Sequence, residues 1–389
     1  MEKLELENGR TILSWAPISS IEESAAQQLK NVASHPCITN PVVVCPDVHA
    51  GYGVTIGSVL PVENALIPNA VGVDIGCSMS ACKTNIEADS VSRETLEKVI
   101  NKVRERIPVG FSHQKEKQSH YIFNDELWKE CPICKENYES AQYQLGTMGG
   151  GNHFIELQKG DDGFLYYMIH SGSRNLGYQV GNAYNKAAND LCKTWRHFDV
   201  VENELAFLPE GVAEYYAYEK EMNFCLKFAS ANHEVMRYHV EVSLQEITSD
   251  IIYEKKWYTR HNYATMEHHH GRDFMIHRKG AIMAREGVEQ IIPGSQGTAS
   301  YIVRGLGNPA SYCSASHGSG RLMSRKKAQE TLSLSTEQEK MKNIIHNMNT
   351  LKQLDEAPSA YKNIEDVLEQ EKDLVTPIVK LTPLAVVKG

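Results

Sequence analysis

One histidine, His317, stands in the stretch "SYCSASHGSGRLMSRKK" (311–327) among serine, alanine and glycine residues. Four basic side chains follow it closely: Arg321, Arg325, Lys326 and Lys327. An imidazole usually has larger neighbours that hold it still, so this ring is unusually bare. The arrangement raises the question of what an accessible histidine does just ahead of a positive cluster.

Asp74 and Cys77 lie three residues apart in "AVGVDIGCSMS", where Gly72 and Gly76 allow a tight backbone. A carboxylate and a thiolate together suit a borderline divalent ion such as manganese, zinc or cobalt. The alternative is a buried cysteine beside a turn aspartate, because free cysteine is commonly buried.

Four glycines in "GTMGGGNHFIEL" precede Asn152, His153 and Glu156. A glycine run lets backbone N–H groups approach a phosphate, although a tight hairpin needs no ligand. Strand alternation places Asn152 and Glu156 on one face and His153 on the other. A shared site therefore requires a bulge or kink near Asn152.

His170 ends the strand-like stretch "FLYYMIH", and Arg174 follows in a glycine–serine turn. A histidine at a strand end can bind metal, and an arginine in such a loop suits a phosphate. A surface histidine beside a solvated arginine is the alternative. The pair "CPIC" (Cys131, Cys134) after His113 and His120 allows a zinc clip, but one CxxC without a second pair is a weak signal.

Six of the sixteen histidines lie between 261 and 317, a density that core packing does not explain. His261 is one of them, whereas the run "HHH" (268–270) suits a solvated loop. Residues 259–330 contain ten Arg and Lys and five Asp and Glu, a local charge of +5 in a chain of net charge −9. The overall charge gives no support to a nucleic-acid partner, but this local excess suits a polyanion.

The elements that must position these residues suggest an α+β chain. We predict strands and turns over the first 80 residues, helices at 92–107 (capped by Ser92), 211–247 and 324–353, and a strand-like C-terminal tail. Beyond 258 the chain loses periodicity, apart from "QIIPGSQGTASYIV". The candidates spread from 47 to 317, so we expect one domain over 1–389. The start lacks a secretory signal and the nine cysteines form no framework, which suggests a cytoplasmic protein without a membrane span.

These motifs, in this order, resemble the RtcB family of GTP-dependent RNA ligases. The resemblance runs from "PDVHAGYG" (46–53) to the terminal "VVKG" and includes "IPGSQGTASYIV" and "LDEAPSAYKNIEDV". It implies an α+β fold with mixed and antiparallel sheets around a central metal-binding cleft. It also implies two manganese ions, GTP as co-substrate, and RNA with 2′,3′-cyclic phosphate or 3′-phosphate and 5′-hydroxyl ends.

By the same resemblance, His317 is the nucleophile that carries GMP, and its small neighbours keep the approach to the ring clear. Cys77 bridges the two ions, with Asp74 and His153 on one and His170 and His261 on the other. Arg174 and Arg321 meet phosphates. The residues implied in GTP binding are Asn152, Glu156, Ser295, Gly318, Ser319, Gly320, Tyr361 and Lys388.

Two other functions remain open. A metal-dependent cyclic phosphodiesterase would use the same ions but has no purpose for His317 or Lys388. A silent RNA-binding scaffold does not need the full ligand set. Departures such as His233 in "ANHEV", where the family usually has arginine, leave the RNA substrate open between tRNA halves and damaged RNA, and an archease-type activator is a further possible partner.

Overall fold

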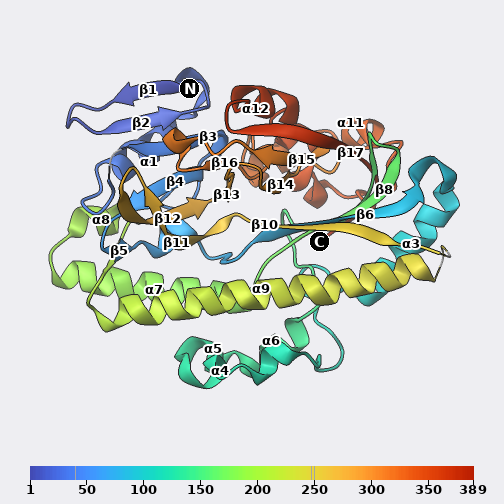
Figure 1. Ribbon diagram of the computed structural model, residues 1–389, viewed down its shortest axis with the longest axis horizontal. Helices are drawn as coiled ribbons and strands as arrows, with labels where there is room; N and C mark the ends of the chain where they lie inside the picture. Colours follow the sequence, from blue (N-terminus) through green and yellow to red (C-terminus); the bar gives the residue numbers. More distant parts are fainter. Residues whose placement is uncertain (40, 247, 249) are drawn as a thin grey trace.

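The computed structural model describes residues 1–39, 41–246, 248 and 250–389. Figure 1 shows two sheets side by side above two long helices. Among the described residues the first sheet has the order β1-β2-β3-β4-β12-β11. Its strands pair antiparallel except for the parallel pair β2 and β3. Their bounds are β1 Glu2–Glu5, β2 Thr11–Ser14, β3 Val42–His49, β4 Ile56–Val62, β12 Arg272–Lys279 and β11 Asn262–His269.

The second large sheet has the order β10-β6-β8-β7-β17-β15-β14 and is antiparallel throughout its described pairs. Its strands are β10 Tyr253–Arg260, β6 Ser78–Glu87, β8 Phe164–Ser171, β7 Phe154–Gly160, β17 Val375–Lys388, β15 Ser300–Gly305 and β14 Glu289–Ile292. Two short pairs complete the strands: β5 Ala65–Leu66 with β9 Leu208–Pro209, and β13 Ala281–Met283 with β16 Ser314–Ser316.

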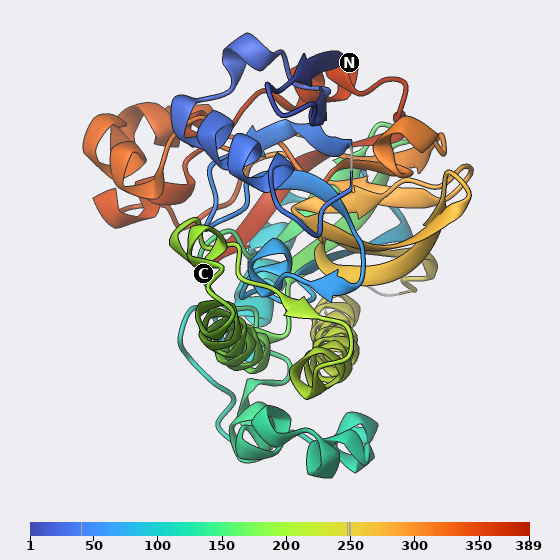
Figure 2. The same ribbon diagram turned by 90° about the vertical axis from the view of Figure 1, so that its left-hand side faces the viewer.

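The long helices α7 (Arg174–Thr194) and α9 (Ala213–Gln245) lie side by side beneath the sheets (Figure 2). A separate group of short helices, α4 Leu127–Glu130, α5 Pro132–Glu136 and α6 Tyr138–Gln144, lies on the far side of α7 and α9 from the sheets. The remaining helices are α1 Glu23–Ala33, α2 Pro68–Val71, α3 Arg93–Arg106, α8 Phe198–Glu202, α10 Arg325–Thr331, α11 Leu334–Lys340 and α12 Ile364–Gln370. No helix in the described part of the chain is long and apolar enough to cross a membrane.

Several predicted elements are confirmed. Helix α3 buries Leu96, Val99, Ile100 and Val103, and the Ser92 side chain accepts a hydrogen bond from the backbone N–H of Thr95. This bond satisfies one of the free amides at the helix start. Helix α9 matches the prediction for 211–247, whose last position lies outside the described residues. The C-terminal tail forms β17, and the α+β class is confirmed.

Three predictions are wrong. Residues 23–33 are the helix α1, because Ala25, Leu29 and Val32 form a buried face that alanines make hard to see in the sequence. The predicted helix over 324–353 is replaced by two short helices, α10 and α11, which the extended Leu332 separates, and α11 ends at Lys340. The supposedly aperiodic stretch from 262 to 279 is the hairpin β11–β12.

Candidate functional site

The two sheets meet where the chain passes from β10 to β11, and the single residue between these strands is His261. Its backbone N–H donates to the carbonyl of Cys77 (3.1 Å), and its carbonyl accepts from the backbone N–H of Gly280 (2.8 Å). Cys77 directly precedes β6, His153 precedes β7, and His170 lies near the end of β8. Strand ends from both sheets therefore bring these side chains to one point.

The thiol of Cys77 is at the centre of this cluster. Its Sγ lies 3.1 Å from Nε2 of His170 and 3.5 Å from Nε2 of His153. Nε2 of His170 is 3.4 Å from Nε2 of His261, and Nε2 of His153 is 3.2 Å from a carboxylate oxygen of Asp74. Two sets of ligand atoms, Cys77–His170–His261 and Asp74–Cys77–His153, each lie within 4.8 Å of one another. Both sets contain the thiol.

Electrostatics make this cluster receptive to cations. Burial lowers the pKa values of His170 and His261 well below the usual value, so both imidazoles are neutral ligands. Partial burial opposes ionisation of Asp74, but the contact with His153 outweighs it and holds the pKa of Asp74 at about 2. Burial and the Asp74 charge raise the pKa of Cys77, whose thiol a bound cation would deprotonate. Mixed carboxylate, imidazole and thiolate donors therefore fit divalent manganese, zinc or cobalt.

The remaining ring nitrogens of two of these histidines are held by backbone carbonyls. Nδ1 of His153 bonds to the carbonyl of Met148 (2.9 Å), and Nδ1 of His170 bonds to that of Asn152 (3.1 Å). Such contacts fix the tautomer and point Nε2 at the metal position. The kink expected near Asn152 is present, since β7 begins only at Phe154 and Gly151 has a positive φ of 69°.

His317 lies next to the ligand cluster, with its ring 4.9 Å from that of His261. One oxygen of Asp47, Oδ2, accepts from the backbone N–H of His317 (3.1 Å) and lies 2.6 Å from its Nδ1. The other oxygen, Oδ1, has no partner among the described residues, and Asp47 is fully buried. The carboxylate therefore fixes the ring with Nδ1 protonated and leaves Nε2 with a free electron pair.

Glycines keep the surroundings of His317 open. Gly280 has φ +63°, and a Cβ there would lie 3.1 Å from Cε1 of His317 and 2.2 Å from Ile56. Gly320 has φ +71°, and a Cβ would meet the carbonyl oxygen of Asp47 at 2.1 Å. Larger residues at either position would push against the strand that carries Asp47 or against the imidazole itself.

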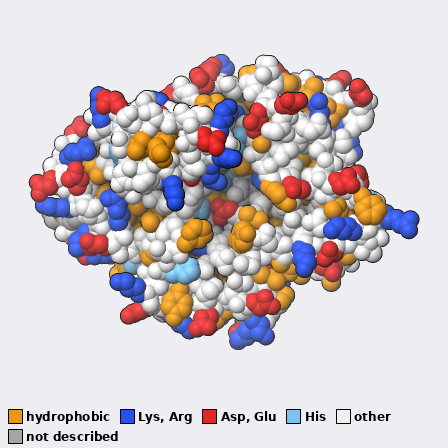
Figure 3. Space-filling model, turned by 180° about the vertical axis from the view of Figure 1, so that it is seen from behind, with side chains coloured by type: hydrophobic (Ala, Val, Ile, Leu, Met, Phe, Trp, Pro, Cys, Tyr) orange, Lys and Arg blue, Asp and Glu red, His pale blue; other side chains and the backbone are white. Residues whose placement is uncertain are grey.

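Two cavities meet at His317. The first, of about 450 Å³, extends toward Tyr361 and Lys388; the second, of about 560 Å³, contains Asp74, Cys77 and His261. Four residues line both: Ile56, Asn152, His317 and Arg325. The face turned away from the viewer in Figure 1 is hollowed near its middle, with Lys and Arg side chains at the border of the hollow (Figure 3).

Most of the residues expected to bind GTP line the first cavity. These are Asn152, Ser295, Gly318, Ser319, Gly320, Tyr361 and Lys388. Glu156 is not among the lining residues: it is buried on β7, where desolvation raises its pKa to about 8. Its Oε2 accepts a hydrogen bond from the side-chain amide of Gln158 (2.7 Å). This bond and the charge of Lys388 lower the pKa of Glu156, but burial raises it by more.

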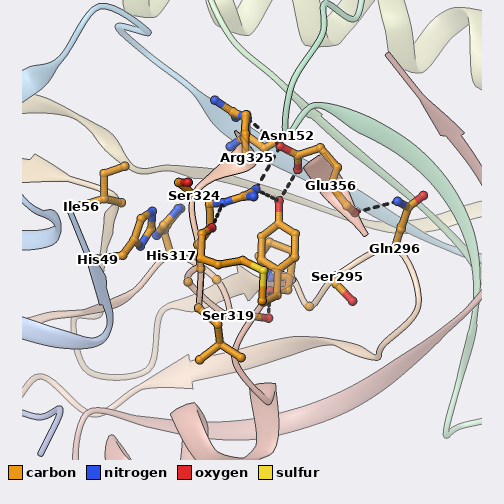
Figure 4. A pocket seen from close by; sticks show the side chains of 18 of the residues that line it. His49, Ile56, Asn152, Ser295, Gln296, His317, Ser319, Ser324, Arg325 and Glu356 are labelled. Carbon is orange, nitrogen blue, oxygen red and sulfur yellow. Dashed lines mark hydrogen bonds and ion pairs between the residues drawn. The ribbon is translucent and has the colours of Figure 1, made fainter. Parts of the chain in front are cut away.

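A carboxylate that the sequence did not single out organises the far side of the first cavity. Glu356 forms ion pairs with Arg321 (3.2 Å), Arg325 (3.0 Å) and Lys388 (3.4 Å), and accepts a short hydrogen bond from the hydroxyl of Tyr361. Figure 4 shows Glu356 beside Arg325 and Asn152, with His49 and His317 together elsewhere in the pocket. Burial opposes ionisation of Glu356, but the Lys388 and Arg325 charges hold its pKa at about 2.

The two arginines expected to contact phosphates lie in different surroundings. Arg321 lines the first cavity, and its guanidinium bonds to Glu356, Tyr361 and the carbonyl of Asp355. Arg174 lines neither cavity and donates to the hydroxyl of Thr147 (3.0 Å) and the carbonyl of Gly110 (3.3 Å).

Residues of the possible zinc clip do not come together. Cys131 and Cys134 are buried beside Cys225 of α9, whereas His120 bonds to Glu234 (3.3 Å) and His113 is exposed. No cluster of metal-binding geometry in the described part of the chain includes them. The run 268–270 also lies apart: His268 pairs with Asp273, His269 with Glu267, and His270 with a backbone carbonyl.

Sequence reasoning counted position 47 and Arg325 among its candidates without giving either a role of its own, and it missed His49 and Glu356. The triplet Asp47-x-His49 ends the valine-rich strand β3, so an acid and a histidine at a strand end were the available signal. His49 lines the first cavity, and burial lowers its pKa to about 4. Glu356 had no comparable signal, because the three cations that pair with it are distant in the sequence.

Comparison with known proteins identifies the family of this chain. Residues 28–389 match the family described as "tRNA-splicing ligase RtcB". The chain is 35% identical to "RNA-splicing ligase RtcB" of Escherichia coli K12, covering 100% of this chain and 99% of that protein. It is 30% identical to "tRNA-splicing ligase RtcB" of Nanoarchaeum equitans (95% and 92%) and to "RNA-splicing ligase RtcB homolog 2" of Entamoeba dispar (94% and 84%). The resemblance noted in the sequence is confirmed, and the chain belongs to the RtcB family.

Proposed function

We propose that this protein is an RNA ligase that joins 2′,3′-cyclic phosphate or 3′-phosphate ends to 5′-hydroxyl ends, with GTP as co-substrate and two manganese ions. The observation that carries the proposal is the place of His317. It lies where two cavities meet, its Nδ1 is held by a buried carboxylate, and a thiol-centred ligand cluster is beside it. A nucleophile, its orienting base and a cation site are thereby combined.

His317 acts as the nucleophile in the first step. Asp47 keeps the proton on Nδ1, so the electron pair of Nε2 attacks the α-phosphorus of GTP. A nitrogen–phosphorus bond forms, the bond to the β-phosphate oxygen breaks, and pyrophosphate leaves. The positive charge that develops on the ring is stabilised by the Asp47 carboxylate. When bound, the two ions would neutralise phosphate charge near Cys77 and His261.

The first cavity holds the nucleotide. Tyr361 offers an aromatic ring for the guanine, and Ser295 and Lys388 offer polar contacts to its edge, with Glu156 behind Lys388. Backbone groups of 318–320 border the path to His317. Arg325 lines both cavities whereas Arg174 lines neither, so Arg325 meets phosphates more directly.

The second cavity takes the RNA ends. Lys279 lies in its wall, where its ammonium donates to the carbonyls of Tyr52 (2.7 Å) and Asn69 (2.9 Å), and burial lowers its pKa to about 7. In the following steps water opens the cyclic phosphate to a 3′-phosphate, and an oxygen of this phosphate attacks the phosphorus of the GMP on His317. The nitrogen–phosphorus bond breaks, so GMP passes to the RNA as a 3′-pp-5′-G end and His317 is regenerated. The 5′-hydroxyl then attacks the RNA 3′-phosphorus, the bond to GMP breaks, and the strands are joined as GMP leaves. We expect tRNA splicing or RNA repair in the cytoplasm, with an archease-type activator as a candidate partner.

The test incubates the protein with manganese and α-labelled GTP, followed by a cyclic-phosphate RNA and a 5′-hydroxyl RNA. Label on the wild type, its absence from His317→Ala, and a joined product support the proposal. Opening of the cyclic phosphate without labelled protein indicates the phosphodiesterase instead. If mass spectrometry of the fully metallated, GTP-treated protein shows no nucleotide adduct at His317, the proposed mechanism is wrong.

A further inference from the structure

The side chain of Asn232, near the middle of α9, is fully buried and uses both ends of its carboxamide. Its oxygen accepts from the backbone N–H groups of Gly146 (2.7 Å) and Thr147 (3.2 Å). Its nitrogen lies 3.1 Å from the carbonyl of Thr147, 3.2 Å from Oγ of Ser171 and 3.1 Å from the carbonyl of Gly172. The side chain thus links two segments that are distant in sequence.

Both segments carry metal-ligand candidates. The first leads from Thr147 into the glycine run before His153, and the second follows His170 at the end of β8. Oγ of Ser171, which accepts from Asn232, donates in turn to the carbonyl of Met148 (2.8 Å). Nδ1 of His153 bonds to that same carbonyl. A continuous chain of hydrogen bonds therefore runs from α9 to the imidazole.

We propose that Asn232 is a positioning residue for the metal centre: it sets the separation of the two segments so that His153 and His170 meet at the Cys77 thiol. This inference rests on the proposed metal site. Asn232 touches none of the three ligands and acts through the Met148 carbonyl, which fixes the ring of His153 with Nε2 toward Asp74. Contacts of this kind outside the ligand shell change metal affinity about 10- to 100-fold.

The chemistry of the carboxamide explains the choice of residue. Asparagine offers, on one short side chain, an acceptor oxygen for the two N–H groups on one side and two donor hydrogens toward the oxygens on the other. Aspartate would direct a carboxylate oxygen at the carbonyls of Thr147 and Gly172. Leucine would leave buried N–H and carbonyl groups without partners.

The neighbouring residue holds the same segment. Nδ1 of His233 lies 2.8 Å from Oγ of Ser80, and its Nε2 lies 3.2 Å from the carbonyl of Ser171. Of these two neighbours on α9, Asn232 is the one whose described bonds reach both segments, since the bonds of His233 go to β6 and to Ser171. Removing Asn232 therefore changes the spacing between the two histidine ligands, whereas α9 itself stays anchored by its apolar face.

The test is a cobalt titration of the metal-free protein, followed by the thiolate-to-cobalt charge-transfer absorption that Cys77 would give. We expect Asn232→Asp to bind cobalt about 10- to 100-fold more weakly, with a changed ligand-field spectrum. Asn223→Asp is the matched control, because Asn223 is exposed on the same helix. The control should retain wild-type affinity. Ser171→Ala breaks the same chain of bonds at a smaller side chain and should weaken binding in the same direction.

Circular dichroism of each metal-free variant checks the fold, and Ser171→Ala decides the question if Asn232→Asp does not fold. Wild-type cobalt affinity and spectrum in a folded Asn232→Asp protein would overturn the inference, as would a wild type without the thiolate band. A wild type that binds cobalt through Cys77 but gains no label from GTP would refute the proposed ligase mechanism alone. The positioning role of Asn232 would then stand on the cobalt data.

Discussion

Replacing Asp47 by asparagine is the sharpest test of how His317 is activated. In the structure one carboxylate oxygen faces both the backbone N–H and Nδ1 of His317, at 3.1 and 2.6 Å, in a fully buried position. Asparagine keeps the shape but removes the charge. Its amide nitrogen must then face either the two donors of His317 or the position of Oδ1, which has no partner in the described part of the chain.

The expected loss follows from the strength of this bond. A hydrogen bond to a charged group contributes about 1.5–3 kcal/mol, which corresponds to roughly a 10- to 150-fold change in rate. If the amide nitrogen turns toward Nδ1, the ring takes the other tautomer and Nε2 loses its free electron pair. A catalytic histidine held in the wrong tautomer is known to lower the rate about 10⁴-fold. We therefore expect Asp47→Asn to transfer GMP to His317 at least 10-fold more slowly.

The assay is single-turnover labelling of the protein from α-labelled GTP at saturating manganese. Asp273→Asn is the control, since Nδ1 of His268 and Asp273 form a similar pair at 2.7 Å on the exposed hairpin β11–β12. That variant should label at the wild-type rate. Cobalt binding by Asp47→Asn should also be unchanged. A folded, metal-binding Asp47→Asn protein that labels within twofold of the wild type would refute the assigned role of the carboxylate.

Three further perturbations test other parts of the site. Cys77→Ala should abolish both manganese retention in equilibrium dialysis and labelling by GTP, and near-normal labelling would contradict a shared thiolate ligand. Lys388→Met should reduce the preference for GTP over ATP in competition labelling, whereas unchanged selectivity would reject contact with the guanine edge. Glu371 is fully buried and accepts a hydrogen bond from the backbone N–H of Ser316 (2.9 Å), the residue before His317. Burial raises the pKa of Glu371 to about 8, so the folded state loses stability as the pH rises from about 4.5 to 8. Glu371→Gln removes that loss. In urea unfolding, the free energy of unfolding of the variant should exceed that of the wild type by a few kcal/mol at pH 9 and be nearly equal to it at pH 4.5. Parallel profiles of unfolding free energy against pH would contradict this.

The ligand candidates were visible in the sequence because each stands beside a local signal. Asp74 and Cys77 lie beside glycines, His153 comes just after a glycine run, and His170 lies at the end of an apolar strand. Strand ends with polar side chains and flexible neighbours are where sites form, whatever the wider topology. The sequence did not show which sheet each strand joins. It therefore could not show that His261 bridges the two sheets.

Long-range packing decides what the sequence left unpredicted. Asp47 and His317 are 270 positions apart, and their contact depends on the packing of β16 beside β3. Helix predictions succeeded where one apolar stripe was long, as in α9, and failed over 324–353, where Leu332 in an extended conformation ends α10. Local periodicity does not record such a break, because apolar residues on both sides continue a helical spacing.

The arrangement around Glu356 shows how such distant contacts shape the nucleotide pocket. Three cations, Arg321, Arg325 and Lys388, surround this one buried carboxylate, which leaves a local charge of +2 in the wall of the first cavity. Without the carboxylate, mutual repulsion and burial would drive these groups apart or lower the pKa of Lys388 further, since burial already lowers it. Glu356 thus fixes the cations in place without cancelling them. A fixed excess of positive charge in the cavity that His317 also lines is the electrostatic condition that binding a triphosphate requires.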